Sequence, residues 1–321
     1  MRPQPVKLHD YAPSTRSMLD DVLQGLRSRP KHVPCKYFYD ERGSDLFEQI
    51  CTLDEYYLTR AELEIMDRHG DEMADALGPW CLVIEYGPGS GRKTRLLLER
   101  MDSPAAYVPI DISGEALMRT AKEFASHFPG LEVLPVCADY TQPFEMPRSR
   151  TPARRRAVYY PGSTIGNFSP EGARDFLAHA AMVTGERGGL LIGVDLRKDP
   201  AILEAAYDDA RGITAKFNMN LLVRFNEELG ADFDLDSFSH RAPYNEALGR
   251  VEMHLVSEKA QTVRIQGETI RFREGETIHT ESCYKYDVEG FSALASSARL
   301  EVETVWTDPR RLFSVQYLVR A

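Results

Sequence analysis

Short, mostly apolar runs alternate with longer amphipathic segments over the central part of the chain. The runs span residues 82–84, 107–110, 131–136, 157–160 and 190–194. Between them, apolar residues recur every three or four positions, which is the period of a helix that buries one face. Apolar strands that are separated by helices are typical of a parallel sheet covered on both sides. The pattern therefore predicts an α/β fold with a doubly wound, mostly parallel sheet.

Helical periodicity also predicts three helices before the first strand, at about residues 14–28, 46–53 and 59–77. Thr59 and Glu62 have the spacing of a capping box, in which two side chains satisfy N–H groups at a helix start. We therefore expect the third helix to begin at Thr59 and to lead directly into the first strand.

The pattern changes after residue 195. A helical stretch covers about 200–229, and extended segments then alternate with glycines, as in an antiparallel meander, at 251–256, 262–265, 269–272 and 276–286. A helix at 288–297 and two strands at 300–306 and 313–319 are expected to complete the first sheet. We therefore expect one domain from 61–196 with 287–321, and a second, α+β lobe from 1–60 with 197–286.

Size and charge narrow the class of protein. The 321 residues exceed the roughly 250–300 at which a single core tends to stop growing, in agreement with two lobes. A net charge of −10 argues against broad nucleic-acid binding. The five cysteines are scattered and form no CxxC pair, so neither a disulfide framework nor a zinc site is expected. Without an apolar signal or membrane-spanning stretch, we expect a cytoplasmic location and no membrane partner.

The first strand ends in a glycine-rich loop that runs from Glu85 through Gly87, Gly89 and Gly91 to Thr94. Arg92 stands where a dinucleotide-binding G-x-G-x-x-G motif needs its third glycine, and it also interrupts a possible phosphate-binding P-loop. The E-x-G-x-G-x-G spacing instead fits methyltransferases that use S-adenosylmethionine. Glycine lets the backbone approach a ligand, and the following helix offers unpaired N–H groups. A glycine-rich turn without a ligand is the alternative interpretation.

Acidic residues also follow the next two strands. Asp111 lies 24 residues beyond Gly87, near the spacing of about 20 residues at which an acid binds ribose hydroxyls. Asp139 and Tyr140 follow the third strand, where an acid and an aromatic ring can bind adenine by a hydrogen bond and by stacking. Taken alone, Asp139 could be an ordinary turn residue. Because the carboxyl ends of parallel strands meet at one edge of a sheet, we expect the three loops to form one site.

Over nearly its whole length, the chain resembles the L-histidine Nα-methyltransferases of ergothioneine biosynthesis. The residues that carry this resemblance are 36–40, 43–47, 55–57, 85–94, 161–168, 206–209, 280–281 and 285–286. The segments around Gly162–Asn167 and Tyr207–Asp209 are far more specific than the glycine loop. The resemblance implies a class I, Rossmann-like methyltransferase domain, and it makes the second lobe a substrate-binding one.

The resemblance also implies the site residues. The cofactor S-adenosylmethionine is expected to contact Gly87, Lys93, Asp111, Asp139 and Tyr140. The carboxylate and amine of the amino-acid substrate are expected to bind to Tyr56, Gly162, Asn167 and Tyr207. The substrate side chain is expected to lie among Tyr39, Met253, Glu281 and Cys283. The expected catalytic residues are Tyr39, Tyr56 and Asn167. No metal is implied.

The chemistry of these residues agrees with methylation of an amine. Transfer of a methyl group from a sulfonium to an amine is an in-line displacement, which needs a neutral, aligned amine and the exclusion of water. Tyrosine and asparagine can orient an amine without blocking its lone pair, and aromatic rings suit a quaternary ammonium product. Any one of the tyrosines alone could equally be a core residue with a satisfied hydroxyl.

One position departs from the family pattern. The family usually has a hydroxyl residue two positions after the glutamate that corresponds to Glu281, and here that position is Cys283. A thiol is a weak hydrogen-bond partner, so we expect Cys283 to contribute little, or Ser282 to replace the hydroxyl through a backbone shift. Glu281 is expected to accept an imidazole N–H by a charge-assisted bond.

The implied activity is trimethylation of the α-amine of free L-histidine to hercynine, a step of ergothioneine biosynthesis. Two alternatives stay open: Nα-methylation of another, aromatic amino acid, and a non-catalytic binding protein on the same fold. Met253 and Glu281 favour histidine, and the intact cofactor loops argue against a binding protein. We expect a monomer that acts on a small molecule.

Overall fold

The computed structural model describes residues 6–11, 15–140, 142 and 144–321. The chain divides into two compact units. The first unit consists of the described parts of Met1–Ala12, Leu58–Arg197 and Lys285–Ala321. The second consists of the described parts of Pro13–Tyr57 and Lys198–Tyr284.

The first unit is built on a sheet of nine strands within the described part of the chain. The strand order is β1-β6-β4-β3-β7-β8-β16-β15, with β5 beside β4. Strand β1 and strands β3 to β8 pair in parallel, whereas β16 is antiparallel to β8 and to β15. The strands are β1 His9–Tyr11, β3 Cys81–Tyr86, β4 Ala106–Asp111, β5 Glu132–Val133, β6 Val136–Ala138, β7 Arg155–Tyr160, β8 Gly189–Asp195, β15 Leu300–Thr307 and β16 Phe313–Arg320. The prediction of a doubly wound, mostly parallel sheet is confirmed.

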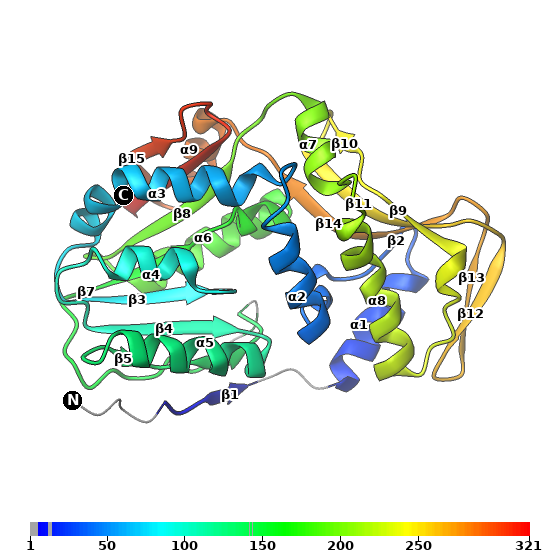
Figure 1. The fold of residues 1–321 in the computed structure, drawn as a ribbon, viewed down its shortest axis with the longest axis horizontal. Coiled ribbons are helices and arrows are strands. Elements are labelled where there is room, and N and C mark those ends of the chain that lie inside the picture. The colour runs from blue at the N-terminus through cyan, green and yellow to red at the C-terminus, as the bar shows by residue number, and fades with distance from the viewer. Residues whose placement is uncertain (1–5, 12–14, 141, 143) are drawn as a thin grey trace. The chain divides into compact units, whose positions relative to one another are not determined.

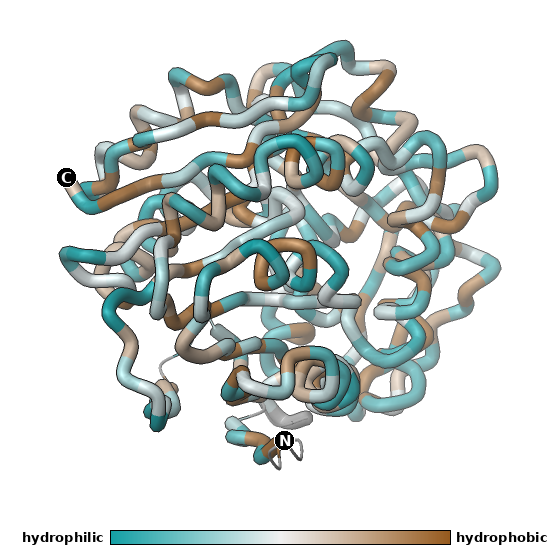
Figure 2. Tube along the Cα trace, turned by 60° about the vertical axis from the view of Figure 1, so that its left-hand side comes forward, coloured by the Kyte–Doolittle hydropathy of each residue, from teal (hydrophilic) through white to brown (hydrophobic). Residues whose placement is uncertain are grey.

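Helices alternate with these strands. They are α3 Tyr57–Leu77, α4 Arg92–Leu98, α5 Gly114–His127, the 3-10 helix η2 Thr164–Asn167, α6 Pro170–Thr184 and α9 Val288–Ser297. In Figure 1, β3 and β4 run the same way, and α4 and α5 lie alongside them. Along the tube in Figure 2, helices carry both hydrophilic and hydrophobic positions, as expected when only one face is buried.

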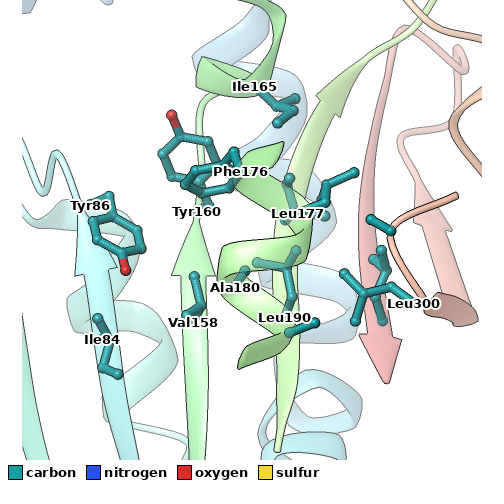
Figure 3. Close-up of a cluster of buried hydrophobic side chains, with 14 of the residues drawn as sticks. Ile84, Tyr86, Val158, Tyr160, Ile165, Phe176, Leu177, Ala180, Leu190 and Leu300 are labelled. Carbon is teal, nitrogen blue, oxygen red and sulfur yellow. The ribbon is translucent and has the colours of Figure 1, made fainter. Parts of the chain in front are cut away.

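The core of the first unit is formed where α6 packs on β7 and β8. Figure 3 shows Val158 and Tyr160 on β7 facing Phe176 and Leu177 on α6. The rings of Tyr160 and Phe176 lie 4.3 Å apart between centroids. Val158 and Tyr160 are two residues apart and so point to the same face of the sheet. Burial of each such side chain stabilises the unit by about 1.5–3 kcal/mol, which holds the carboxyl ends of β7 and β8 in place.

The second unit contains a five-stranded sheet and a separate two-stranded hairpin among its described residues. The sheet order is β10-β11-β14-β2, with β9 beside β11. The strands are β2 Lys31–His32, β9 Phe238–Arg241, β10 Tyr244–Asn245, β11 Arg250–Ser257, β12 Gln261–Ile265, β13 Glu268–Phe272 and β14 Thr277–Tyr284. The helices are α1 Thr15–Arg27, η1 Cys35–Phe38, α2 Glu41–Ile50, α7 Pro200–Tyr207, α8 Ile213–Leu229 and η3 Leu235–Ser237.

The predicted meander is wrong in its pairing order. β11 pairs directly with β14. β12 and β13, which lie between these two strands in the sequence, pair only with each other and form a separate hairpin. Gln266 and Gly267 join the two hairpin strands with positive φ angles of 47° and 84°. Two consecutive positive φ angles suit a tight two-residue hairpin turn, which closes this pair locally.

Two further elements differ from the prediction. β1 pairs in parallel with β6, so the assignment of residues 1–60 as a whole to the second lobe is wrong for His9–Tyr11. The third predicted strand is interrupted at Leu134 and Pro135 and becomes β5 and β6. Proline has no N–H to donate to a neighbouring strand, which explains a break at that point.

The helix predicted over 200–229 is two helices, α7 and α8. The break lies at Asp209, whose carboxylate accepts the N–H groups of Ile213 and Thr214 at 3.0 and 2.7 Å. Burial alone would raise the pKa of Asp209, but these backbone N–H groups hold it below its usual value. Asp209 therefore supports the first turn of α8, which begins at Ile213, while α7 has ended at Tyr207.

Candidate functional site

The glycine-rich loop joins β3 to α4, as predicted. Gly87 and Gly91 have positive φ angles of 71° and 66°, in the region that favours glycine. A Cβ atom at Gly91 would lie 2.4 Å from the ring of Phe124, whereas no atom lies within 4 Å of a Cβ built on Gly87. Gly91 is therefore needed for packing, while Gly87 borders space that a ligand can enter.

Glu85, the acid of the glycine loop motif, is fully buried. Its carboxylate accepts hydrogen bonds from Thr94 Oγ1 at 2.7 Å and from the hydroxyl of Tyr107. Burial raises the pKa of Glu85 to about 7 in spite of these bonds. Thr94 is on α4 and Tyr107 is on β4, so hydrogen bonds to Glu85 connect the start of the glycine loop to both elements.

Asp111 ends β4 and is half-buried. Its Oδ1 accepts the N–H of Ser113 at 2.9 Å. Burial nevertheless raises the pKa of Asp111 to about 6. The N–H of Gly87 donates to the carbonyl of Ile110, the residue before Asp111, at 2.8 Å. The structure thus brings Gly87 and Asp111 to the same edge of the sheet, and an acid with a raised pKa there marks a candidate ligand-binding residue.

Asp139 and Tyr140 follow β6, the strand next to β4. Asp139 is buried, at 9% exposure. The hydroxyl of Tyr140 lies 3.0 Å from that of Tyr160, and its ring centroid lies 5.0 Å from that of Tyr86. Tyr140 therefore packs on the aromatic core of the first unit. Asp139, the residue before it, follows β6, and Asp111 ends the neighbouring strand β4.

A buried carboxylate joins two predicted site residues of the first unit. Glu62 on α3 is fully buried and accepts Lys93 Nζ at 2.5 Å and the N–H of Gly162 at 3.0 Å. The predicted capping box of Thr59 and Glu62 is wrong, because α3 begins at Tyr57 and Glu62 lies inside the helix. A T-x-x-E pattern does not distinguish a cap from a buried acid, so sequence reasoning missed this role.

A second buried ion pair supports the loop that carries Gly162 and Asn167. Asp195, at the end of β8, pairs with Lys285 Nζ at 2.7 Å, and both side chains are almost completely buried. The N–H of Asp195 donates to Ser163 Oγ at 2.9 Å. Asn167 ends η2 in the same loop. The contact between Asp195 and Ser163 joins residues far apart in the chain, and no local pattern indicated it.

Three predicted substrate residues of the second unit share one aromatic cluster. The ring of Tyr56 lies 6.1 Å from that of Tyr207 and 6.3 Å from that of Phe47, and Phe47 lies 5.8 Å from Tyr39. These pairs meet edge to face, and Tyr56 and Tyr207 are each 7% exposed. The structure therefore joins the three tyrosines in one chain of contacts, in which Phe47 links Tyr39 to Tyr56 and Tyr56 contacts Tyr207 directly.

Met253, Glu281 and Cys283 lie on one face of the strand pair β11 and β14. Met253 is opposite Glu281 in the register, and Glu281 and Cys283 are two residues apart on β14. All three side chains are buried. The Cys283 thiol donates to Glu281 Oε2 at 3.3 Å, and the small contribution of Cys283 to substrate recognition stays a prediction.

Ser282 does not replace the missing hydroxyl. Its side chain lies on the other face of β14, where Oγ is 3.1 Å from Nε2 of His279. A backbone shift that turned Ser282 toward Glu281 would reverse the alternation along the strand. The alternative expectation for Ser282 is therefore wrong.

Comparison with known proteins identifies the family. Residues 18–320 match the family described as "Histidine-specific methyltransferase, SAM-dependent". The chain belongs to this family. It is 40% identical over 306 residues to the histidine N-alpha-methyltransferase of Mycolicibacterium smegmatis, covering 94% of each chain, and 41% identical over 294 residues to that of Mycobacterium tuberculosis, covering 90% of each. It is also 34% identical over 286 residues to ergothioneine biosynthesis protein 1 of Neurospora crassa, covering 87% of this chain and 32% of that protein.

In this histidine-specific methyltransferase, the predicted site residues are divided between the two units. The first unit carries Gly87, Lys93, Asp111, Asp139, Tyr140, Gly162 and Asn167. The second unit carries Tyr39, Tyr56, Tyr207, Met253, Glu281 and Cys283. Contacts within each unit link most of these residues, and their action on a single substrate stays a prediction.

A polar network in the second unit supports Tyr207 and had no signal in the sequence. His240 Nε2 lies 2.8 Å from the carbonyl oxygen of Tyr207, which can only accept, so this nitrogen carries the proton. His240 Nδ1 then accepts from Asn218 Nδ2 at 2.8 Å, and Asn218 also donates to the carbonyl of His254 at 3.0 Å. Burial lowers the pKa of His240, which keeps the imidazole neutral as this pattern requires.

The described residues carry neither a metal-ligand cluster nor a membrane-spanning helix. Among them, no group of three or more histidine, cysteine, aspartate or glutamate side chains could hold a metal ion. No described helix is both long and apolar enough to cross a bilayer. α3 has 21 residues, but it carries charged side chains such as Asp67 and Arg68.

Proposed function

We propose that this protein trimethylates the α-amine of free L-histidine to hercynine, with S-adenosylmethionine as methyl donor, as a step of ergothioneine biosynthesis. The observation that carries the proposal is the buried Glu281 carboxylate, which lies opposite Met253 and is held by Cys283. A buried carboxylate favours a ligand that brings an N–H donor, and the imidazole of histidine has one. Membership of the histidine-specific family supports the same substrate.

The first unit fits S-adenosylmethionine. Gly87 borders open space, and half-buried Asp111 offers a carboxylate for ribose hydroxyls at the same strand edge. Asp139 and Tyr140 would bind adenine, and the ammonium of Lys93 would bind the carboxylate of the cofactor. When bound, the cofactor supplies a methyl group activated by its sulfonium.

The chain contributes alignment and exclusion of water rather than a covalent intermediate. An amine attacks only when it is neutral and in line with the methyl group. Tyr56, Asn167 and Tyr207 carry neutral hydroxyl and amide groups that can orient the amine and the carboxylate of histidine. The aromatic faces around Tyr39 suit the quaternary ammonium that forms after the third transfer. We propose that the chain acts as a monomer in the cytoplasm and that the reaction needs no metal.

The test is a mass-spectrometric assay of the full chain with S-adenosylmethionine and each free amino acid. We expect mono-, di- and trimethylated histidine to appear in succession. Imidazole propionate, which lacks the α-amine, should stay unmodified and is the matched control. Turnover of an aromatic amino acid in place of histidine would support the alternative substrate. Cofactor binding without any methylated product would instead support a binding protein.

A further inference from the structure

Glu62 joins a residue expected to bind the cofactor with one expected to bind the substrate. Its side chain is 1% exposed and contacts Lys93 Nζ and the N–H of Gly162. We infer that Glu62 is a positioning residue, which holds the cofactor lysine and the substrate loop in one arrangement and neutralises the lysine for a cationic cofactor. The inference rests on the proposed function, because the roles of Lys93 and Gly162 are assigned there.

The structure leaves space for the carboxylate of Glu62. Gly193 lies on β8, and a Cβ atom there would be 2.6 Å from Glu62 Oε1 and 3.0 Å from the backbone nitrogen of Gly162. Any larger residue at position 193 would displace one of these groups. Glycine at that position therefore leaves the space in which a carboxylate from α3 meets the loop after β7.

Glu62 also fixes the backbone of the substrate loop. Its two oxygens lie 3.1 and 3.0 Å from the nitrogen of Gly162. A buried backbone N–H needs an acceptor, and Gly162 has a positive φ of 79°, so the loop conformation depends on local contacts. Loss of the carboxylate would release the N–H of Gly162 and the ammonium of Lys93 together.

The charge of Glu62 matters because S-adenosylmethionine carries a positive sulfonium. An uncompensated ammonium in the same site would oppose the binding of such a cation. The ion pair with Glu62, at 2.5 Å, removes this repulsion. An ammonium has three donors, so Lys93 can pair with Glu62 and still donate to a cofactor carboxylate. The reaction product S-adenosylhomocysteine has no sulfonium charge and provides the neutral comparison.

The test measures by calorimetry how tightly the full chain binds S-adenosylmethionine and S-adenosylhomocysteine. In Glu62→Gln, which keeps the side-chain size and removes the charge, we expect affinity for S-adenosylmethionine to fall about tenfold more than affinity for S-adenosylhomocysteine. In the double variant with Lys93→Met, the ratio of the two affinities should return toward that of the wild type, because the uncompensated ammonium is gone.

Glu132→Gln is the matched control. Glu132 is also a buried carboxylate of the first unit, and it pairs with Arg150 at 2.9 Å. Its replacement should leave the affinity ratio unchanged even if it lowers the melting temperature. For the backbone contact, hydrogen exchange at Gly162 should be faster in Glu62→Ala than in Glu62→Gln, which keeps one acceptor oxygen.

An affinity ratio in Glu62→Gln equal to that of the wild type would overturn the inference, and so would an equal loss for both ligands. Failure of the proposed function has a different signature. A wild-type chain that binds both ligands but methylates no histidine would refute histidine as substrate, while the affinity ratio would still decide the role of Glu62. A wild-type chain that binds neither ligand would overturn both.

Discussion

The two units bury ionisable groups whose pKa values shift in opposite directions. In the first unit, burial raises the pKa of Glu85 to about 7 and that of Asp111 to about 6. In the second unit, burial lowers the pKa values of His240 and His254, and lowers that of His279 to about 4. In both units the neutral form is favoured, because burial removes the hydration of a charge. Acid should therefore relieve a cost of burial at Glu85 and Asp111 and impose one at the three histidines.

The units also differ in how their candidate site residues come together. In the first unit, most of the residues proposed to bind the cofactor follow neighbouring parallel strands, so the sheet itself brings them close together. In the second unit, Tyr39, Tyr56 and Tyr207 come from separate segments and meet through side-chain packing. Substitutions at Gly87 or Asp111 should therefore affect cofactor binding, and substitutions in the second unit should affect substrate binding.

The largest expected effect is that of Gly87→Val on the first unit. A valine at a φ of 71° is strained, and its side chain would enter the space that the ligand needs. Because the side chain would occupy ligand space, we expect calorimetry to show a loss of S-adenosylmethionine affinity on the order of 100-fold, or about 2.8 kcal/mol. Gly185→Val is the control, because Gly185 has a φ of 68° and no atom within 4 Å of a built Cβ. Equal losses in both variants would contradict a ligand at Gly87.

Asp111→Asn should separate cofactor binding from folding. We expect cofactor affinity to weaken by about 1.5–3 kcal/mol, the range for hydrogen bonds to a charged group. Because the folded-state pKa of Asp111 is raised to about 6, the ionised carboxylate disfavours folding at neutral pH, so the melting temperature should stay equal or rise. Wild-type cofactor affinity should also weaken as the pH falls below about 6, and the variant should lack this step. A lower melting temperature with unchanged affinity would show a purely structural role.

Glu281→Ala should act on the second unit alone. An imidazole N–H left unpaired in a buried site costs about 1–3 kcal/mol, so histidine affinity should fall by that amount while cofactor affinity stays the same. Glu252→Ala is the control, because Glu252 is a partly buried acid on the opposite face of β11, paired with Arg250 at 2.7 Å. Unchanged histidine affinity in Glu281→Ala would put the substrate assignment in question.

A fall in pH from 7 to 5 should destabilise the second unit more than the first. The folded-state pKa values of its three shifted histidines lie below the unfolded value of about 6.5. The stability they contribute is therefore full above pH 6.5 and is lost as the pH falls through their lowered pKa values, which for His279 means toward about 4. Glu85 and Asp111 have raised pKa values, so they take up protons over the same range and their penalty on the first unit declines.

Hydrogen exchange at pH 7 and 5 measures this difference directly. Protection should decrease in β11 and β14 and change less in β3 and β4. His279→Gln should reduce the acid sensitivity of the second unit, whereas His127→Gln replaces an exposed histidine of the first unit and should change nothing. Burial also lowers the pKa of His179 on α6, which gives the first unit a loss of the same sign at that one histidine. Equal loss of protection in both units would contradict the expected difference in their acid sensitivity.

The smallest expected effect is that of Cys283→Ser. A serine hydroxyl can donate to Glu281 as the thiol does at 3.3 Å, and it is the stronger partner. Histidine affinity measured by calorimetry should be equal or slightly higher. Cys283→Ala removes the donor and should weaken it slightly. Complete loss of activity in Cys283→Ser would reveal a role for the thiol beyond holding Glu281.

The sequence by itself determined the sheet of the first unit and the position of its glycine loop. Apolar runs and helical periods are local properties of the chain, and parallel strands bring their carboxyl ends to one edge without further information. The family resemblance, carried by segments such as Gly162–Asn167, determined the candidate substrate residues in the same way.

Only the tertiary structure decided which partners the buried polar groups have. Glu62 had the local pattern of a helix cap, yet it binds Lys93 and Gly162 from inside α3. β11 pairs with β14 across an inserted hairpin, and His240 supports Tyr207 through a carbonyl. These choices join residues far apart in the chain. Local propensity cannot specify them, because the free energy of a buried hydrogen bond depends on which groups the whole fold brings within reach.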